Sequence, residues 1–203
     1  MNGGWVFLDK DGTLVQDVPY NADPGKMTFE PGAAEGLRLL AEAGFRLVVV
    51  SNQSGVARGY FEEPALEAVW SRLDEMASAS AGARFSGFYY CPHHPGGSIS
   101  PYNVECDCRK PRPGLLLRAA RDHGIDLSQA WMVGDILNDV EAGRAAGCRT
   151  ILIDNGHETE WEPGPRRRPD FMAKDLHQAA EIILAQRAAS QPEGQEREPN
   201  HEQ

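Results

Sequence analysis

Short apolar segments alternate along this chain with stretches that have helical spacing. Six runs have the length and composition of strands, namely residues 5–8, 45–50, 85–90, 130–133, 150–153 and the short segment 170–173. Helical patterns lie between and after them, at residues 31–43, 64–77, 113–123, 137–146 and 176–187. Alternation of this kind is typical of a parallel sheet covered by helices on both faces. We therefore predict an α/β fold, a doubly wound and mostly parallel sheet with residues 170–173 at its edge.

The extent of this alternation sets the expected domain. Residues 1–187 carry it, whereas residues 188–203 are polar and without periodicity, and we expect them to form a disordered tail. Only 39 residues separate Asp11 from Ser51 and 58 separate Ser51 from Lys110, and the predicted elements fill both gaps. We therefore expect one domain without a large cap, and an open site.

Composition and charge narrow the possible partners. Hydrophobic residues make up 41% of the 203 residues and charged residues 25%, as in globular chains. Apolar runs such as residues 47–50 are far shorter than the roughly 18 residues of a membrane helix. The N-terminus has neither the basic nor the apolar part of a secretory leader, so a cytoplasmic location is expected. A net charge of -10 disfavours nucleic acid, and we interpret Arg166–Arg168 as a solvated turn. A monomer is the default expectation.

Polar side chains that are suited to catalysis or ligand binding follow the first two predicted strands. Asp9 and Asp11 come directly after residues 5–8, and Ser51 opens a polar cluster after residues 45–50. Ligands of open α/β sheets bind at the carboxyl edge, where such strands end. Each pattern alone also fits an ordinary turn or a helix N-cap. Their joint occurrence favours a ligand site at this edge.

Further along the chain, a cationic pair and another carboxylate complete the set. Arg109 and Lys110 supply fixed positive charge in an otherwise acidic chain, and both residue types bind phosphate oxygens well. Asp135 follows the predicted strand at residues 130–133. Three carboxylates and two cations around one sheet edge indicate a site that handles phosphate.

Four motifs, taken in order, resemble those of the haloacid-dehalogenase-like (HAD) phosphatases. They are Asp9-x-Asp11-Gly12-Thr13, Ser51-Asn52, Lys110, and Gly134-Asp135 with Asp139. The resemblance runs from residue 7 to about residue 184 and implies a phosphoric monoester hydrolase that works through a covalent aspartyl-phosphate. It implies these roles: Asp9 as nucleophile, Asp11 as general acid and base, Ser51 and Lys110 as stabilisers of the phosphoryl group.

The same resemblance implies a Mg²⁺ cofactor. Its protein ligands would be Asp9, Asp135 and the backbone carbonyl of Asp11, because Mg²⁺ prefers oxygen ligands and keeps several waters. We expect Asp139 to orient this group or to cap the following helix.

A loop at residues 91–109 contains a second candidate metal site. Cys91 is followed by His93 and His94, and twelve residues separate His93 from Cys106, which is followed by Cys108. Three thiols and one imidazole suit a tetrahedral Zn²⁺, and spacing alone leaves open which histidine serves. Such a closed site would stabilise the loop that carries the cationic pair, with no position left for substrate.

The zinc loop also resembles a narrower family. Three runs carry the likeness, Tyr90-Cys91-Pro92-His93-His94-Pro95, Cys106-Asp107-Cys108-Arg109-Lys110-Pro111 and the segment Ser51-Asn52-Gln53-Ser54-Gly55-Val56-Ala57-Arg58-Gly59. They look like the D-glycero-D-manno-heptose 1,7-bisphosphate 7-phosphatases and the related histidinol-phosphate phosphatases. This resemblance selects His93 as the zinc ligand.

The narrower family implies a sugar bisphosphate as substrate and a place in nucleotide-activated heptose biosynthesis. The implied substrate-binding residues are Asp17, Tyr20, Asn52, Gln53, Ser54 and Arg109. One departure is Ile136, where the heptose enzymes commonly have a Lys. Two alternatives stay open: a histidinol-phosphate or other small phosphate-monoester phosphatase, and a catalytically silent zinc-stabilised binding module.

Overall fold

The protein is described by a computed structural model covering residues 4–159 and 161–190. Six strands form one sheet in the order β3-β2-β1-β4-β5-β6, and every neighbouring pair is parallel. The strands are β1 (Trp5–Leu8), β2 (Arg46–Asn52), β3 (Phe85–Cys91), β4 (Ala130–Gly134), β5 (Arg149–Ile153) and β6 (Phe171–Ala173). The predicted parallel sheet is confirmed, with β6 at its edge.

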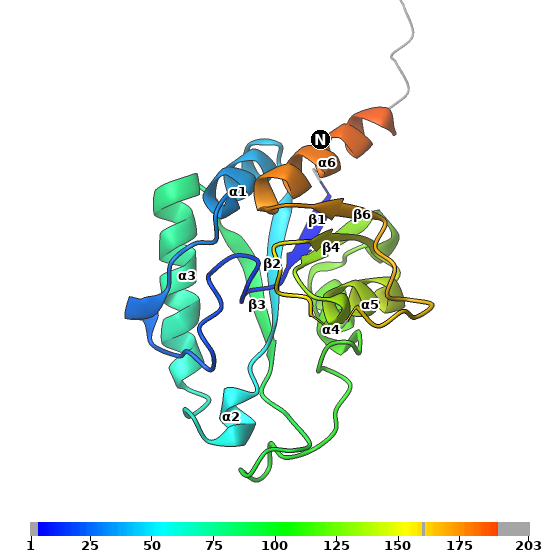
Figure 1. Cartoon of the computed structure of the whole chain (residues 1–203). Coiled ribbons are helices and arrows are strands. Elements are labelled where there is room, and N and C mark those ends of the chain that lie inside the picture. The colour runs from blue at the N-terminus through cyan, green and yellow to red at the C-terminus, as the bar shows by residue number, and fades with distance from the viewer. Residues whose placement is uncertain (1–3, 160, 191–203) are drawn as a thin grey trace, which may run out of the picture.

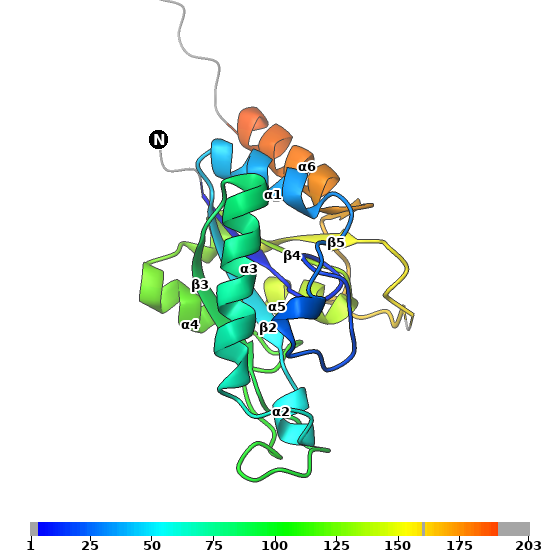
Figure 2. The same cartoon turned by 90° about the vertical axis from the view of Figure 1, so that its left-hand side faces the viewer.

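Helices cover both faces of this sheet (Figures 1 and 2). They are α1 (Ala33–Glu42), α2 (Gly55–Arg58), α3 (Ala65–Ala81), α4 (Gly114–His123), α5 (Leu137–Ala146) and α6 (Leu176–Ala189), with 3-10 turns η1 (Pro24–Lys26) and η2 (Leu127–Gln129). Helices α1, α3 and α6 pack together on one face, and α4 and α5 lie on the other.

The strand sequences explain the two-sided packing. Val6 and Leu8 of β1 pack in the cluster of α1, α3 and α6, whereas Phe7 between them packs in the cluster that contains Leu115 of α4. All three β1 side chains are fully buried. Because successive residues of a strand point to opposite faces, a wholly apolar strand requires cover on both.

Several boundaries differ from the sequence-based expectations. Strand β2 continues to Asn52, so Ser51 lies within the strand and not after it. Helix α2 and the two 3-10 turns were not predicted, since one turn is too short for apolar periodicity to show. Helix α6 ends at Ala189, two residues beyond the predicted end, and residues 191–203 of the predicted tail lie outside the described residues.

The connections explain why the site edge stays open. Between β1 and β2 the chain forms only η1 and α1, and between β2 and β3 only α2 and α3. The loop at residues 91–109 lies beside α2 (Figure 1), where the backbone N–H groups of Ser98 and Ile99 donate to the Ala57 carbonyl at 2.8 and 3.0 Å. No helix in the described part of the chain is both long and apolar enough to cross a membrane.

Candidate active site

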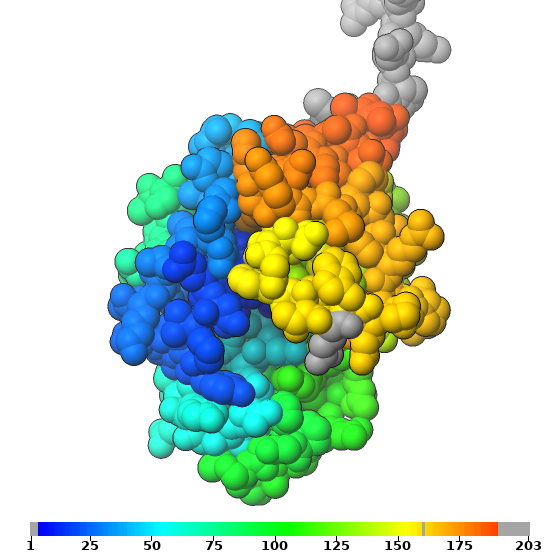
Figure 3. All heavy atoms as spheres, viewed as in Figure 1, coloured from blue at the N-terminus to red at the C-terminus, as the bar shows by residue number. Residues whose placement is uncertain are grey.

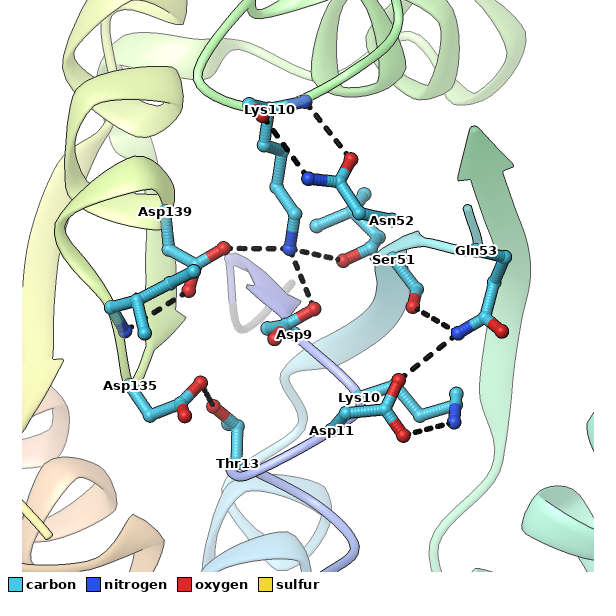
Figure 4. Close-up of polar contacts among 12 residues, drawn as sticks. Asp9, Lys10, Asp11, Thr13, Ser51, Asn52, Gln53, Lys110, Asp135 and Asp139 are labelled. Atoms are coloured by element: carbon cyan, nitrogen blue, oxygen red, sulfur yellow. Dashed lines mark hydrogen bonds and ion pairs between the residues drawn. The ribbon is translucent and has the colours of Figure 1, made fainter. Parts of the chain in front are cut away.

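Lys110 lies at the centre of the predicted residues. Its Nζ is 2.6 Å from Asp9 Oδ1 and 2.6 Å from Asp139 Oδ1, and it donates to the Val50 carbonyl at 2.9 Å (Figure 4). The ammonium group is almost fully buried. Burial by itself lowers the pKa of Lys110, but Asp139 and Asp9 outweigh it and raise this pKa above its ordinary value. The lysine is therefore a permanent cation at the end of β1.

Three buried carboxylates surround this cation. One oxygen from each of Asp9, Asp135 and Asp139 lies within 4.8 Å of the others. Burial, followed by the charges of Asp9 and Asp139, raises the pKa of Asp135 to about 9. Burial also raises the pKa of Asp139 to about 6, although Lys110 opposes it. The cluster carries more negative charge than one lysine neutralises, and its oxygen donors fit a divalent cation such as Mg²⁺.

Asp139 performs one of the two supporting tasks expected of it, the capping of the following helix. Its Oδ2 accepts a hydrogen bond from the backbone N–H of Ile136, at 3.3 Å, and so caps the start of α5. Its other oxygen pairs with Lys110. Gly134 makes room for this arrangement, because a Cβ there would lie 2.3 Å from the Asp139 side chain. The structure further adds Asp139 to the carboxylates that could contact a metal.

Asp11 is held on the other side of the β1 end. The Gln53 amide donates to Asp11 Oδ2 at 3.0 Å and to Ser51 Oγ at 2.8 Å, while Lys10 contacts the second Asp11 oxygen. Burial raises the pKa of Asp11, and the nearby Lys10 only partly opposes this. A carboxyl with a raised pKa is suited to donate a proton and later accept one.

Next to Asp11 lies a cavity of about 280 Å³. Five of the six predicted substrate-binding residues line it, namely Asp17, Tyr20, Asn52, Gln53 and Ser54. In the space-filling view the surface is hollowed where the blue segment at residues 10–25 meets the cyan and green segments (Figure 3). The cavity is therefore open to a small molecule, with Asp11 in its wall.

Arg109, the sixth predicted residue, lies apart from this cavity. It lines a neighbouring cavity of about 310 Å³ together with His94 and Lys110. Burial, together with the charge of Arg58, lowers the pKa of Arg109. Neither Arg109 nor Arg58 has a carboxylate partner within the described residues. Nη1 of Arg109 and Nε of Arg58 are buried and have no hydrogen-bond acceptor among these residues. Arg58 instead contacts His94 at 3.0 Å and lies over the Tyr20 ring, 5.8 Å from its centroid.

Asn52 connects the second strand to the end of the loop at residues 91–109. Its side-chain amide donates to the Lys110 carbonyl at 3.1 Å, and its side-chain oxygen accepts from the Lys110 backbone N–H at 3.0 Å. This pair of hydrogen bonds fixes the main chain from which the lysine side chain projects. Asn52 therefore positions Lys110 as well as lining the cavity.

The predicted zinc ligands converge in the loop at residues 91–109. Sγ of Cys91 lies 3.4 Å from Cys106 Sγ, which is 3.3 Å from Cys108 Sγ, and His93 Nδ1 is 3.4 Å from Cys108 Sγ and 3.8 Å from Cys91 Sγ. A tetrahedron around Zn²⁺, with ordinary zinc–sulfur and zinc–nitrogen bonds, has edges of about 3.6–3.8 Å. The arrangement fits a zinc ion, with His93 and not His94 in the fourth position.

Some functional contacts were not predicted from the sequence. Thr13 belongs to the first motif, and its hydroxyl donates to Asp135 Oδ1 at 3.1 Å. His157 contacts the other oxygen of Asp135 from the segment after β5. The motif signalled Thr13, whereas nothing in the spacing singled out His157. The expected solvated turn at Arg166–Arg168 is wrong for Arg167, which is partly buried and pairs with Glu141 of α5 at 3.0 Å.

The fold and this site define a hydrolase of the HAD-like class, and residues 107–179 match the family described as HAD-hydrolase-like. The D-glycero-beta-D-manno-heptose-1,7-bisphosphate 7-phosphatase of Escherichia coli K12 is 39% identical over 188 residues, covering 92% of this chain and 96% of that protein. The chain belongs to the family of these D-glycero-D-manno-heptose-1,7-bisphosphate 7-phosphatases.

Two further relatives agree with this assignment. The D-glycero-D-manno-heptose-1,7-bisphosphate 7-phosphatase of Thermosynechococcus vestitus is 40% identical over 184 residues, covering 88% of this chain and 94% of that protein. The crystal structure of D,D-heptose 1,7-bisphosphate phosphatase from B. bronchiseptica, complexed with magnesium and phosphate, superposes with a TM-score of 0.78 at 31% identity, covering 90% of this chain and 99% of the other.

Proposed function

We propose that this protein removes the 7-phosphate of D-glycero-D-manno-heptose 1,7-bisphosphate, with Asp9 as nucleophile. The observation that supports this most is the Asp9 carboxylate, held by Lys110 at 2.6 Å and clustered with Asp135 and Asp139, two residues before Asp11, which lines the cavity. The relatives that are named for this reaction match nearly the whole chain.

In the first step an Asp9 oxygen attacks phosphorus in line. The bond between phosphorus and the sugar oxygen breaks as the Asp9 oxygen–phosphorus bond forms, and Asp11 protonates the leaving oxygen. The raised pKa of Asp11 supports this role, because the carboxyl group keeps a proton to donate. The sugar leaves with a free hydroxyl, and Asp9 carries the phosphoryl group.

In the second step Asp11 takes a proton from a water molecule, which attacks the same phosphorus. The new oxygen–phosphorus bond releases the Asp9 carboxylate and inorganic phosphate. Ser51 and Lys110 stabilise the phosphoryl oxygens in both steps, and Gln53 holds Ser51 and Asp11 in place with one amide.

Asp9, Asp135 and the backbone carbonyl of Asp11 would hold the Mg²⁺ ion. When bound, the ion neutralises charge on the transferring group and on the carboxylates. The excess of buried acid over cation in this cluster supports a divalent ion there. Cys91, His93, Cys106 and Cys108 would hold a structural Zn²⁺ that orders the loop carrying Arg109 and Lys110.

The unpaired arginines favour a bisphosphate over histidinol phosphate. Arg58 lies over the ring of Tyr20, which lines the cavity next to Asp11, and Arg109 lines the second cavity with Lys110. Neither arginine has a carboxylate partner in the described part of the chain. A second phosphate would satisfy them, whereas the ammonium group of histidinol phosphate would be repelled. Arg58 and Arg109 also supply positive charge that is missing at Ile136, the position where the heptose enzymes commonly have a Lys.

The test is phosphate release with Mg²⁺ from the α- and β-anomers of the heptose bisphosphate and from histidinol phosphate, at matched concentrations. We expect kcat/KM for one bisphosphate to exceed that for histidinol phosphate at least 100-fold, about 2.7 kcal/mol of differential transition-state stabilisation. A preference for histidinol phosphate would contradict the proposed substrate, and the absence of phosphate release from all three compounds would contradict the proposed phosphatase activity.

A further inference from the structure

The segment that follows β5 crosses the carboxyl edge of the sheet and binds both loops of the carboxylate cluster. The Asn155 side chain donates to the Gly12 carbonyl at 2.8 Å. His157 Nδ1 lies 2.8 Å from Asp135 Oδ2. Glu158 accepts from the backbone N–H of Leu137, at 2.6 Å, at the start of α5. Three nearby side chains thus tie the loop after β1 to the loop after β4.

A glycine creates the space that His157 occupies. Gly12 has φ +78, and a Cβ at this position would lie 2.4 Å from His157 Nδ1 and 2.1 Å from Asp135 Oδ2. Any larger residue would push the imidazole and the carboxylate apart. The close approach therefore depends on the same Asp-Gly turn that carries Asp11.

Asp135 is held at both of its oxygens. Thr13 donates to Oδ1 at 3.1 Å, and the imidazole contacts Oδ2. When Asp135 is ionised, as it is when it binds a cation, its carboxylate only accepts, so the hydrogen then lies on Nδ1 of the ring. A carboxylate has about four lone-pair positions, so two hydrogen bonds still leave positions free for a cation. Hydrogen bonds to the outer lone pairs orient a metal ligand.

We propose that His157 is a positioning residue, whose imidazole holds Asp135 in the orientation that binds a divalent cation. The proposal rests on the proposed Mg²⁺ site. The geometry of Asp135 supports it, because this carboxylate is buried beside Asp9 and Asp139. Without the imidazole, Thr13 on Oδ1 would give the one remaining side-chain hydrogen bond to Asp135 among the described residues.

The test is the Mg²⁺ dissociation constant of the zinc-loaded protein by isothermal titration calorimetry, without substrate. His157→Ala should weaken binding about 10- to 100-fold. His157→Asn places an amide N–H near the former Nδ1 and should restore most of the affinity. His177→Ala is the matched control, because His177 lies exposed on α6 and pairs only with Glu181 across 4.0 Å in the described structure. Steady-state rates should follow, with the kcat of His157→Ala recovering at high Mg²⁺ and its KM for substrate unchanged.

The outcomes separate this proposal from the proposed function. If the unaltered protein binds Mg²⁺ and His157→Ala binds it equally well, the positioning role is wrong and the metal site stands. If His157→Asn is as weak as His157→Ala, an N–H donor is not what matters, and the proposal also fails. If the unaltered protein binds no Mg²⁺, the metal site itself is wrong, and this inference is overturned with it.

Discussion

The two candidate metal clusters of this protein are built in opposite ways. The carboxylates Asp9, Asp135 and Asp139 project from the ends of central strands and from α5, around a lysine that already neutralises part of their charge. In the second cluster Cys91 ends β3, and His93, Cys106 and Cys108 lie on the irregular loop that follows it. The sheet gives the first cluster its shape, whereas we expect the second cluster to need a bound Zn²⁺ to hold its shape.

We therefore expect the carboxylate cluster to contribute mainly to the reaction and the cysteine cluster mainly to stability. A metal that binds a preformed site contributes mainly to the reaction, while a metal that orders a loop contributes to folding. Removing a carboxylate from the first cluster should therefore abolish activity with little loss of stability. Removing a zinc ligand should lower the stability before it affects the chemical step.

The largest effect is expected from Asp9→Asn. The amide keeps the size of the carboxylate but cannot attack phosphorus, so kcat should fall by more than about 10³-fold. The melting temperature should stay the same or rise, because one of three buried negative charges is removed. Phosphate-release assays and thermal melts measure the two quantities. Turnover at the original rate would contradict the covalent mechanism.

Cys106→Ser should have the largest effect on stability. Loss of one of four ligands weakens zinc binding by several kcal/mol, which corresponds to a fall in melting temperature of about 10 °C for a chain of this size. The measurements are zinc content by atomic absorption and thermal melts.

Cys148→Ala is the matched control for that variant. Cys148 is a buried thiol that does not belong to the cluster of possible zinc ligands, and burial raises its pKa to about 12. This variant should keep its zinc and lose only about 1 kcal/mol. Equal melting temperatures for Cys106→Ser and the unaltered protein would contradict a structural role for zinc.

The smallest effect concerns pH and belongs to the carboxylate cluster. The pKa of Asp135 is raised to about 9 and that of Asp139 to about 6, so each binds a proton more tightly when folded than when unfolded. The free energy of unfolding of the Mg²⁺-free protein should therefore fall as the pH rises above about 4, the ordinary carboxyl pKa. The contribution of Asp139 is lost by about pH 6 and that of Asp135 by about pH 9. Saturating Mg²⁺ should flatten this slope by stabilising the ionised forms.

Urea unfolding at pH 5.5, 7 and 8.5, with and without Mg²⁺, measures this slope. Asp135→Asn should remove the part between pH 7 and 8.5 in Mg²⁺-free protein. An unchanged slope in that variant would show that other groups carry the pH dependence.

The fold and the clusters differ in how much of them the sequence predicts. Apolar runs such as residues 47–50 predicted the sheet because a strand buried on both faces is apolar throughout. Helix α2 escaped prediction, since its four residues span one turn. The residues at the strand ends were predicted as well, because parallel strands bring their carboxyl ends to one edge.

Contacts between distant side chains could not be predicted in the same way. Asn52 and Lys110 lie 58 positions apart, and their two hydrogen bonds depend on the path of the whole intervening loop. His157 reaches Asp135 across 22 positions through a segment without periodicity. Motif spacing indicates which residue types meet at an edge, but side-chain rotamers and loop paths decide which of them touch.

The double hydrogen bond from Asn52 has a consequence for how such proteins diversify. It anchors the backbone at Lys110, while Cys106 and Cys108 fix the chain just before it. Insertions or exchanges between His93 and Cys106 can then be absorbed with the lysine still beside Asp9. The loop is thus a region where evolution or an engineer can reshape one wall of the site while the reaction machinery stays as it is.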